Sequence, residues 1–284
     1  MQQHFIPKVL LSNFVDRQTK RNRGLWLWFK ASDLWEHHSL GAVASMSNFY
    51  SDVRPNGELD HTAEYQMQRL ESTIMPTLRY HIEARRRISP PLPYDAFVTF
   101  VATLICRNPY RISDVKSEVT NRLLADLKTD FTSPEAFQNL RADFARRTGR
   151  SFPNLAEPQS ALKHVRFEMN HFASVALSML QMPALTERLG TAQIIFLCAP
   201  DVASFVTGDV PYLAYSDSAG TLTTLCVPLS PRTAAVFSWK AEPKYAYLDI
   251  DRATVLSVNS DIINASREYV ICSSKDALDG LLRS

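Results

Sequence analysis

The sequence predicts an α+β protein in which a central helical layer packs against a mainly antiparallel sheet. Three observations support this fold class: apolar residues at helical spacing fill the middle, short β-prone segments fill the last third, and an aromatic-rich segment stands alone near the start. Because an isolated hairpin is only marginally stable, we expect the N-terminal arm to join the C-terminal sheet, bringing residues 1–30 next to residues 200–230. The 284 residues are predicted to form one domain, with a strand arm at 1–55, a helical layer at 56–190 and a sheet region at 191–284.

The arm carries one clear strand signal, the segment Leu25-Trp26-Leu27-Trp28-Phe29. It suits a hairpin whose turn lies near Asn22-Arg23-Gly24, and Ser47–Tyr50 is a second short extended candidate.

The helical pattern begins after Asp60, with apolar residues three and four apart. The stripe comprises Met67, Leu70, Ile74 and Leu78, and we expect Pro76 to kink or interrupt this helix. Residues 94–107 form an apolar block whose length favours a buried helix, ended by Asn108-Pro109.

Further helices are predicted at 112–127, 133–147 and 158–180. The second has the clearest boundaries: Ser133 is a candidate N-cap, Pro134 occupies the first helical position, and Gly149 lies just beyond the end.

Short strands are predicted after Gly190, at 194–197, 204–207, 222–227, 234–237 and 245–248. Between Val255 and Ser274, a polar helix at 260–266 is expected to connect two strand-like ends, and a short helix is expected from Lys275.

Composition indicates a globular, cytoplasmic protein. Apolar residues make up 45% and charged residues 21%, far from the composition of disordered chains, and no run approaches the ~18 apolar residues of a membrane helix. The first residues lack the basic and apolar regions of a signal peptide. The four cysteines have no short paired spacing, which argues against a zinc knuckle and a secreted disulfide framework.

Charge is unevenly distributed although the net charge is only +2. Residues 79–150 carry thirteen Lys/Arg against eight acids, whereas residues 191–284 carry seven against ten. The basic region could face an anionic partner such as nucleic acid; the alternative is an ordinary solvated helix face.

Two short polar motifs lie within apolar sequence. His4, in Gln3-His4-Phe5-Ile6-Pro7, could transfer a proton or bind a metal, or simply cap a neighbouring carbonyl. Asp209 follows a predicted strand, where Gly208 would let the chain turn and display the carboxylate; the alternative is an Asp-turn bonded to its own backbone.

Two glutamates and an arginine form a second candidate set. Glu64 and Glu71 are seven residues apart and therefore share one helix face, where they could bind a metal or share a proton, or remain solvated surface acids. Arg107 ends an apolar helix and needs a carboxylate, carbonyls or an anionic ligand, with Glu71 or Asp209 as candidate ion-pair partners.

Other catalytic patterns are missing from the sequence. There is no Gly-x-Gly-x-x-Gly, Walker loop, His-Glu-x-x-His or Cys-x-x-Cys, and the tandem pair His37-His38 would make a poor metal clamp. Ser230, in a Pro-Leu-Ser-Pro bend predicted to be rigid and exposed, lacks the elbow of a nucleophilic serine.

The order of these pieces resembles the bacterial domain-of-unknown-function family 4238. The similarity runs over nearly the whole chain and includes Gln3-His4-Phe5-Ile6-Pro7, Asn13-Phe14, Phe49-Tyr50, Glu64, Glu71, Arg107-Asn108-Pro109, Thr207–Pro211, Pro228–Pro231 and Asn259 ahead of Tyr269. Gly208 departs from the pattern, because the family usually has serine there.

The resemblance implies one domain and a shared polar site without naming a substrate. If the residues converge, His4, Glu71 and Asp209 would be catalytic, and Gln3, Arg107 and Asn259 would bind substrate, as in a hydrolase that cleaves a nucleic-acid phosphodiester. The alternative is a non-catalytic binding or regulatory module whose polar cluster is structural. The sequence leaves cofactor, metal ligands and oligomeric state open.

Overall fold

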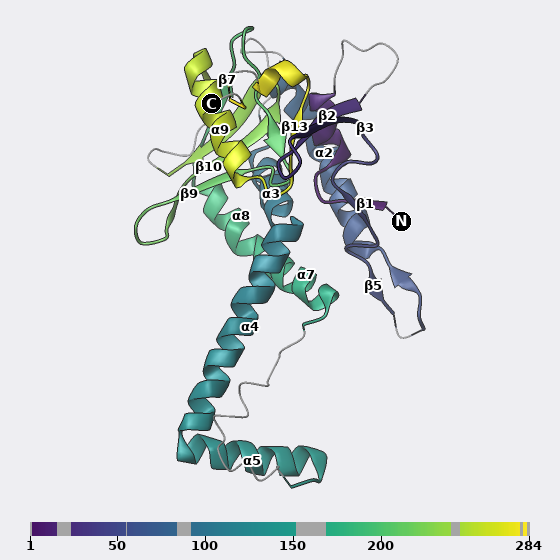
Figure 1. Ribbon diagram of the computed structural model, residues 1–284, viewed down its shortest axis with the longest axis vertical. Coiled ribbons are helices and arrows are strands. Elements are labelled where there is room, and N and C mark those ends of the chain that lie inside the picture. The colour runs from purple at the N-terminus through teal and green to yellow at the C-terminus, as the bar shows by residue number, and fades with distance from the viewer. Residues whose placement is uncertain are drawn as a thin grey trace.

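The fold is mixed α+β, as the sequence predicts. The computed structural model describes residues 2–15, 24–54, 56–83, 92–151, 169–239, 245–278 and 281–282 (Figure 1). Two main sheets lie at one end with three helices, α2 (Thr62–Glu83), α3 (Tyr94–Cys106) and α8 (Met182–Gly190). Helix α4 (Pro109–Thr132) projects away from them and carries α5 (Pro134–Thr148) across its far end.

The larger sheet has five strands in the order β12-β7-β11-β10-β9. They are β7 (Gln193–Cys198), β9 (Leu213–Ser216), β10 (Leu222–Ser230), β11 (Thr233–Ser238) and β12 (Tyr245–Asp249). All neighbours are antiparallel except β12 and β7. Strand β9 was not expected, since its residues after Leu213 are exposed and give little apolar signal.

The N-terminal arm joins strands of the C-terminal third, but in a second sheet. Its order is β3-β2-β13-β8, with β2 (Gly24–Phe29), β3 (Leu34–Ser39), β8 (Thr207–Gly208) and β13 (Tyr269–Cys272). Strand β13 pairs with β2 on one side and β8 on the other, so both its edges are occupied and it does not extend the larger sheet. The strands that were expected to form one sheet are therefore divided between two main sheets.

The hairpin turn differs from the prediction. Strands β2 and β3 are joined at residues 30–33, and Gly24 opens β2 opposite Ser39. A side chain at Gly24 would collide with the ring of His37, so this glycine permits close strand packing rather than a turn. Asn22 and Arg23 lie outside the described residues.

Short elements complete the arm. Strand β1 (Gln2–His4) pairs with β4 (Ser45–Ser47), while residues 48–50 form a turn instead of the expected extended piece. Helix α1 (Lys8–Leu11) and the 3₁₀ turn η1 (Ser12–Phe14) bury apolar side chains, and β5 (Asp52–Val53) pairs with β6 (Leu59–Asp60).

The predicted helical layer is present. Helix α2 (Thr62–Glu83) continues through Pro76, because that residue is exposed while Ile74, Met75 and Leu78 anchor the opposite face. Helix α3 (Tyr94–Cys106) is almost wholly buried between α2 and α8. No helix of the described segments is long and apolar enough to cross a membrane.

The predicted Ser133 cap is confirmed at α5, and Asn108, which was expected only to end the preceding helix, also caps α4. Asn108 caps α4 (Pro109–Thr132), and Ser133 caps α5 (Pro134–Thr148) by accepting from the Ala136 N–H at 3.2 Å. Gly149 ends α5 in the left-handed conformation, with φ of 66°.

The last helices differ in extent from the expectation. The segment predicted at 158–180 contains α7 (His171–Leu180), while residues 152–168 lie outside the described part. Helix α8 (Met182–Gly190) was not expected. Helix α9 (Arg252–Ala265) begins after the Asp251 cap, well before residue 260, so the strand-like segment expected after Val255 is helical. The 3₁₀ turn η3 (Lys275–Leu278) follows β13.

Candidate functional site

Arg107 organises an N-terminal polar cluster, which we define as Gln3, His4, Tyr50, Glu64, Glu71 and Arg107. The guanidinium is 2% exposed at the end of α3, where Nη1 contacts Glu71 Oε1 at 2.6 Å and Nε donates to the Phe5 carbonyl at 3.0 Å. The Tyr50 hydroxyl donates to the Arg107 carbonyl at 2.7 Å. Of the two predicted ion-pair partners, Glu71 is therefore the one observed.

Gln3 uses both ends of its amide inside the protein. Its Oε1 accepts from the Tyr50 N–H at 2.6 Å, and its Nε2 donates to the Ser51 hydroxyl at 2.8 Å. Since Gln3 is fully buried, these bonds fix β1 against the turn that follows β4.

His4 is a buried, neutral imidazole. Burial, then the Lys8 charge, lowers its pKa from 6.5 to about 4; Arg107 acts in the same direction, and hydrogen bonding to the Gly41 and Leu40 backbone opposes it. The Nε2 atom has no hydrogen-bond partner among the described residues, which leaves Nδ1 to face those carbonyls. A neutral ring of this kind presents Nε2 as an acceptor.

Glu64 lies on the same side of α2 as Glu71 and is 6% exposed. Its Oε1 accepts from Gln68 Nε2 at 2.9 Å, whereas Oε2 has no partner within the described segments, and neither does Arg107 Nη2. Both glutamates and Arg107 are close enough to Tyr50 to affect its pKa, which burial raises well above the usual value. Each buried polar atom left unpaired costs about 1–3 kcal/mol.

Asp209 lies in a separate network and is fully buried, so the expected displayed carboxylate is wrong. Its Oδ1 accepts from the Arg267 N–H at 2.9 Å, and Oδ2 accepts from the Glu268 N–H at 2.6 Å, the Tyr269 N–H at 3.4 Å and the Tyr110 hydroxyl at 3.0 Å. The carboxylate thus accepts from three successive N–H groups where β13 begins. It is not an Asp-turn, because these partners lie nearly sixty residues away.

Asn259 forms a third set of contacts. Its Nδ2 donates to the Ser204 carbonyl at 2.8 Å, and its Oδ1 accepts from the Val206 N–H at 3.1 Å. The amide therefore fastens the segment before β8 to α9.

The remaining candidates do not form a nucleophile or a metal site. Ser230 is 4% exposed at the end of β10, so the expected exposed bend is wrong; Pro228 continues the strand across a register shift. The four cysteines are buried and lie outside any disulfide, and burial raises the pKa of Cys106 to about 11 and of Cys226 to about 12. No group of three potential metal ligands occurs within the described ranges.

The predicted site residues thus belong to three sets of contacts. Gln3, His4, Glu71 and Arg107 come together in the N-terminal polar cluster, whereas Asp209 and Asn259 each bond elsewhere. Tyr50 and Tyr110 were not proposed as site residues, because a single tyrosine in a sequence carries no signal of the backbone that it reaches.

Comparison with known protein families identifies the chain. A family model described as "Protein of unknown function (DUF4238)" matches residues 2–276. The chain belongs to the DUF4238 family. No curated protein and no solved structure matched it.

Gly208, where the resemblance leads us to expect a serine, has a structural explanation. A side chain at this position would overlap the hydroxyl of Ser266 and approach the Tyr269 carbonyl to 3.4 Å. The Ser266 side chain, which donates to the Ile262 carbonyl at 2.7 Å, occupies the space that a serine at 208 would need.

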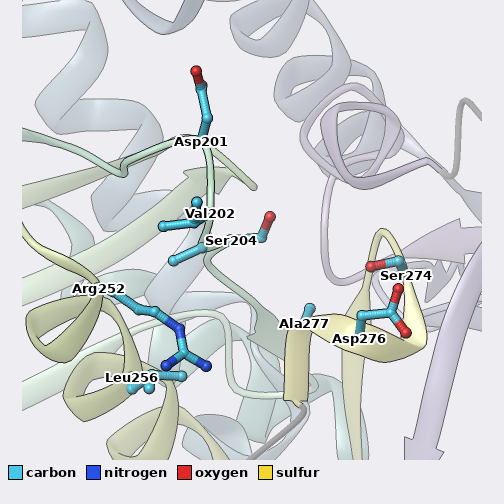
Figure 2. Close-up of a pocket in the computed structure, with 9 residues that line it drawn as sticks. Asp201, Val202, Ser204, Arg252, Leu256, Ser274, Asp276 and Ala277 are labelled. Carbon is cyan, nitrogen blue, oxygen red and sulfur yellow. The ribbon is translucent and has the colours of Figure 1, made fainter.

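A surface hollow of about 170 Å³ lies beside the Asn259 contacts. Figure 2 shows its lining from the loop after β7, the start of α9 and the η3 region, with Arg252 reaching in from α9 and Asp201 turned away. Ser204, whose carbonyl Asn259 holds, contributes to this lining, and sequence reasoning missed the hollow because its residues span three distant segments.

Proposed function

We propose that this DUF4238 protein is a non-catalytic binding or regulatory module in which most of the polar network is structural. One observation carries the proposal: Gln3, Asp209 and Asn259 direct their side-chain hydrogen bonds at the protein's own backbone and side chains. A group that already holds several internal partners has little capacity left for a substrate.

Arg107 adds to this argument. Its positive charge is already balanced by Glu71 at 2.6 Å, and its Nε supports the backbone at Phe5. A phosphate bound at the remaining Nη2 would bring further negative charge next to the Glu71 carboxylate, which already neutralises this buried guanidinium. The proposal includes a cytoplasmic location, which cysteines that form no disulfide support.

The test compares stability with activity in two variants, His4→Ala and Asp209→Asn. We expect both to lower the melting temperature, and we expect neither the wild type nor the variants to cleave single-stranded RNA, DNA or bis(p-nitrophenyl) phosphate. Cleavage by the wild type that both variants lose at unchanged melting temperature would contradict the proposal.

A hydrolase is the second candidate, and His4 favours it. The neutral imidazole presents Nε2 as an acceptor near a guanidinium and could take a proton from water, although a pKa of about 4 makes it a weak base. An anionic substrate, with a phosphodiester as the predicted class, would have to reach a side chain that is only 7% exposed.

Exposed arginines on α5 support the nucleic-acid partner that is expected from the charge distribution. Arg146 and Arg147 are more than three quarters exposed there, although both pair with Asp143. Figure 1 places α5 at the far end of α4 from β1, so a nucleic acid held there would lie away from His4. Salt-dependent binding of a duplex, weakened by Arg146→Gln with Arg147→Gln, would support this partner, and unchanged binding would remove it.

A further inference from the structure

The hollow beside the Asn259 contacts lies where two neighbouring parallel strands end. Strands β7 and β12 are parallel, and the chain leaves the first through the loop at residues 199–206 and the second directly into α9. Residues 201–204 and the start of α9 form two walls of the hollow, and the η3 region forms the third (Figure 2). In open sheets with parallel strands, ligands commonly bind outside the carboxyl ends of those strands.

The wall that follows β7 is fixed by internal contacts on both sides. Asn259 Nδ2 donates to the Ser204 carbonyl at 2.8 Å. Arg232 donates from Nη1 to the Ala203 carbonyl at 3.0 Å and pairs through Nη2 with Asp201. This wall is therefore formed before any ligand arrives, which lowers the conformational entropy that binding must offset.

The charges that line the hollow have opposite signs and lie on different walls. Asp201 is paired with Arg232, so the remaining charges are Arg252 at the start of α9 and Asp276 in η3. Figure 2 shows Arg252 on one side of the hollow and Asp276 with Ser274 on the other. An anion would meet the Asp276 carboxylate and a cation would meet the Arg252 guanidinium, whereas a ligand that carries both charges complements both walls.

The size of the hollow and its apolar lining restrict the ligand further. Its volume of about 170 Å³ exceeds the ~10–15 Å³ that one water needs and is below the ~300 Å³ of sites for drug-sized molecules. Val202, Leu256 and Ala277 contribute apolar surface. A small zwitterion with a short apolar side chain matches the volume, the two charges and this lining.

We propose that the hollow binds a free α-amino acid with a short apolar side chain, an inference that rests on the proposed role as a binding module and names its ligand. The ligand's carboxylate accepts from the Arg252 guanidinium, and its ammonium donates to the Asp276 carboxylate. The hydroxyls of Ser204 and Ser274 are further polar partners in the lining. Arg252 and Asp276 are both exposed, so the ligand enters from solvent without displacing a buried side chain.

The first experiment compares L-valine with two analogues that each lack one charge. L-valinamide has no carboxylate, and 3-methylbutanoate has no ammonium group. Thermal shift measured against ligand concentration should show that L-valine binds more tightly than either analogue by at least about threefold, the scale of one exposed ion pair. Equal affinity for L-valine and either analogue, or no response to L-valine, would overturn the proposal.

Two variants at exposed positions connect the ligand's charges to the hollow. Arg252→Gln should bind L-valine and L-valinamide equally, because the carboxylate has lost its partner, and Asp276→Asn should bind L-valine and 3-methylbutanoate equally. Arg69→Gln, a matched change at an exposed arginine on α2, should retain the wild-type preference. If Arg252→Gln or Asp276→Asn retains the full wild-type preference, the ligand binds elsewhere and the proposal is wrong.

Consumption of L-valine, measured in the same samples by amino-acid analysis, separates this inference from the proposed function. L-valine that binds and is recovered unchanged supports both. L-valine that binds and is consumed contradicts the non-catalytic role and leaves the amino-acid site standing. L-valine that does not bind overturns the site, while the non-catalytic role is still decided by the cleavage and melting experiments on His4→Ala and Asp209→Asn.

Discussion

Asp209→Asn provides the most direct test of the structural interpretation of the polar network. The asparagine oxygen can replace Oδ2 and keep its three donors, but its NH₂ would then face the Arg267 N–H that Oδ1 now accepts at 2.9 Å. One charge-assisted bond is lost, worth about 1.5–3 kcal/mol, because the Arg267 N–H is left facing a second donor. We expect a loss of about 3 kcal/mol in the free energy of unfolding.

The assay is chemical denaturation at pH 7, with Asp217→Asn as the matched control. Both hydrogen bonds that Asp217 receives, from the Ala219 and Thr221 N–H groups, go to its Oδ1. An asparagine can keep both bonds in this exposed loop, so we expect a change of at most about 0.5 kcal/mol. If Asp209→Asn costs no more than the control, the carboxylate is not a structural cap and the reasoning fails.

Three further outcomes are expected. Glu71→Gln leaves the Arg107 charge buried without its partner and should cost about 3 kcal/mol in denaturation experiments. The pKa of His4 is lowered from 6.5 to about 4 in the folded protein, so its contribution to the free energy of unfolding is complete above pH 6.5. Up to about 3 kcal/mol of this free energy is lost as the pH falls to 4. Denaturation across this range should show the loss in the wild type and not in His4→Gln. Gly208→Ser should be destabilised by collision with Ser266, and the double variant Gly208→Ser, Ser266→Gly should recover stability, so additive losses in a double-mutant cycle would refute the steric explanation.

Much of the fold could be predicted because local signals and packing agree. The Ser133 cap, the left-handed Gly149 and the apolar block of α3 each have a physical cause within a few residues. Pro76 shows where a local rule fails, since the buried stripe of α2 outweighs one missing hydrogen bond. The split into two sheets depends on which strand occupies each edge of β13, and no short sequence pattern specifies that choice.

The contacts of the candidate site were harder to predict because they join side chains to distant backbone. Asp209 bonds to residues 267–269, Asn259 to residues 204–206 and Tyr50 to the Arg107 carbonyl. Side-chain chemistry could indicate that Arg107 needs a carboxylate, and the ion pair with Glu71 was among the predicted possibilities. It could not indicate that backbone N–H groups already bond to both oxygens of Asp209, because every residue except proline carries the same backbone N–H group.

The dipeptide Arg107-Asn108 explains why one sequence motif does not correspond to one site. Helix α3 ends at this point and α4 begins, so the two neighbouring side chains point into different networks. Arg107 reaches Glu71 in the N-terminal polar cluster, while Asn108 caps α4 and its Nδ2 donates to the Asp209 carbonyl at 2.7 Å. A substitution here would disturb both networks through the junction of the helices, so a functional loss in such a variant is no evidence that the two networks share a substrate. Changes confined to one network, such as Glu71→Gln for the N-terminal polar cluster and Asp209→Asn for the other, separate the contributions of the two.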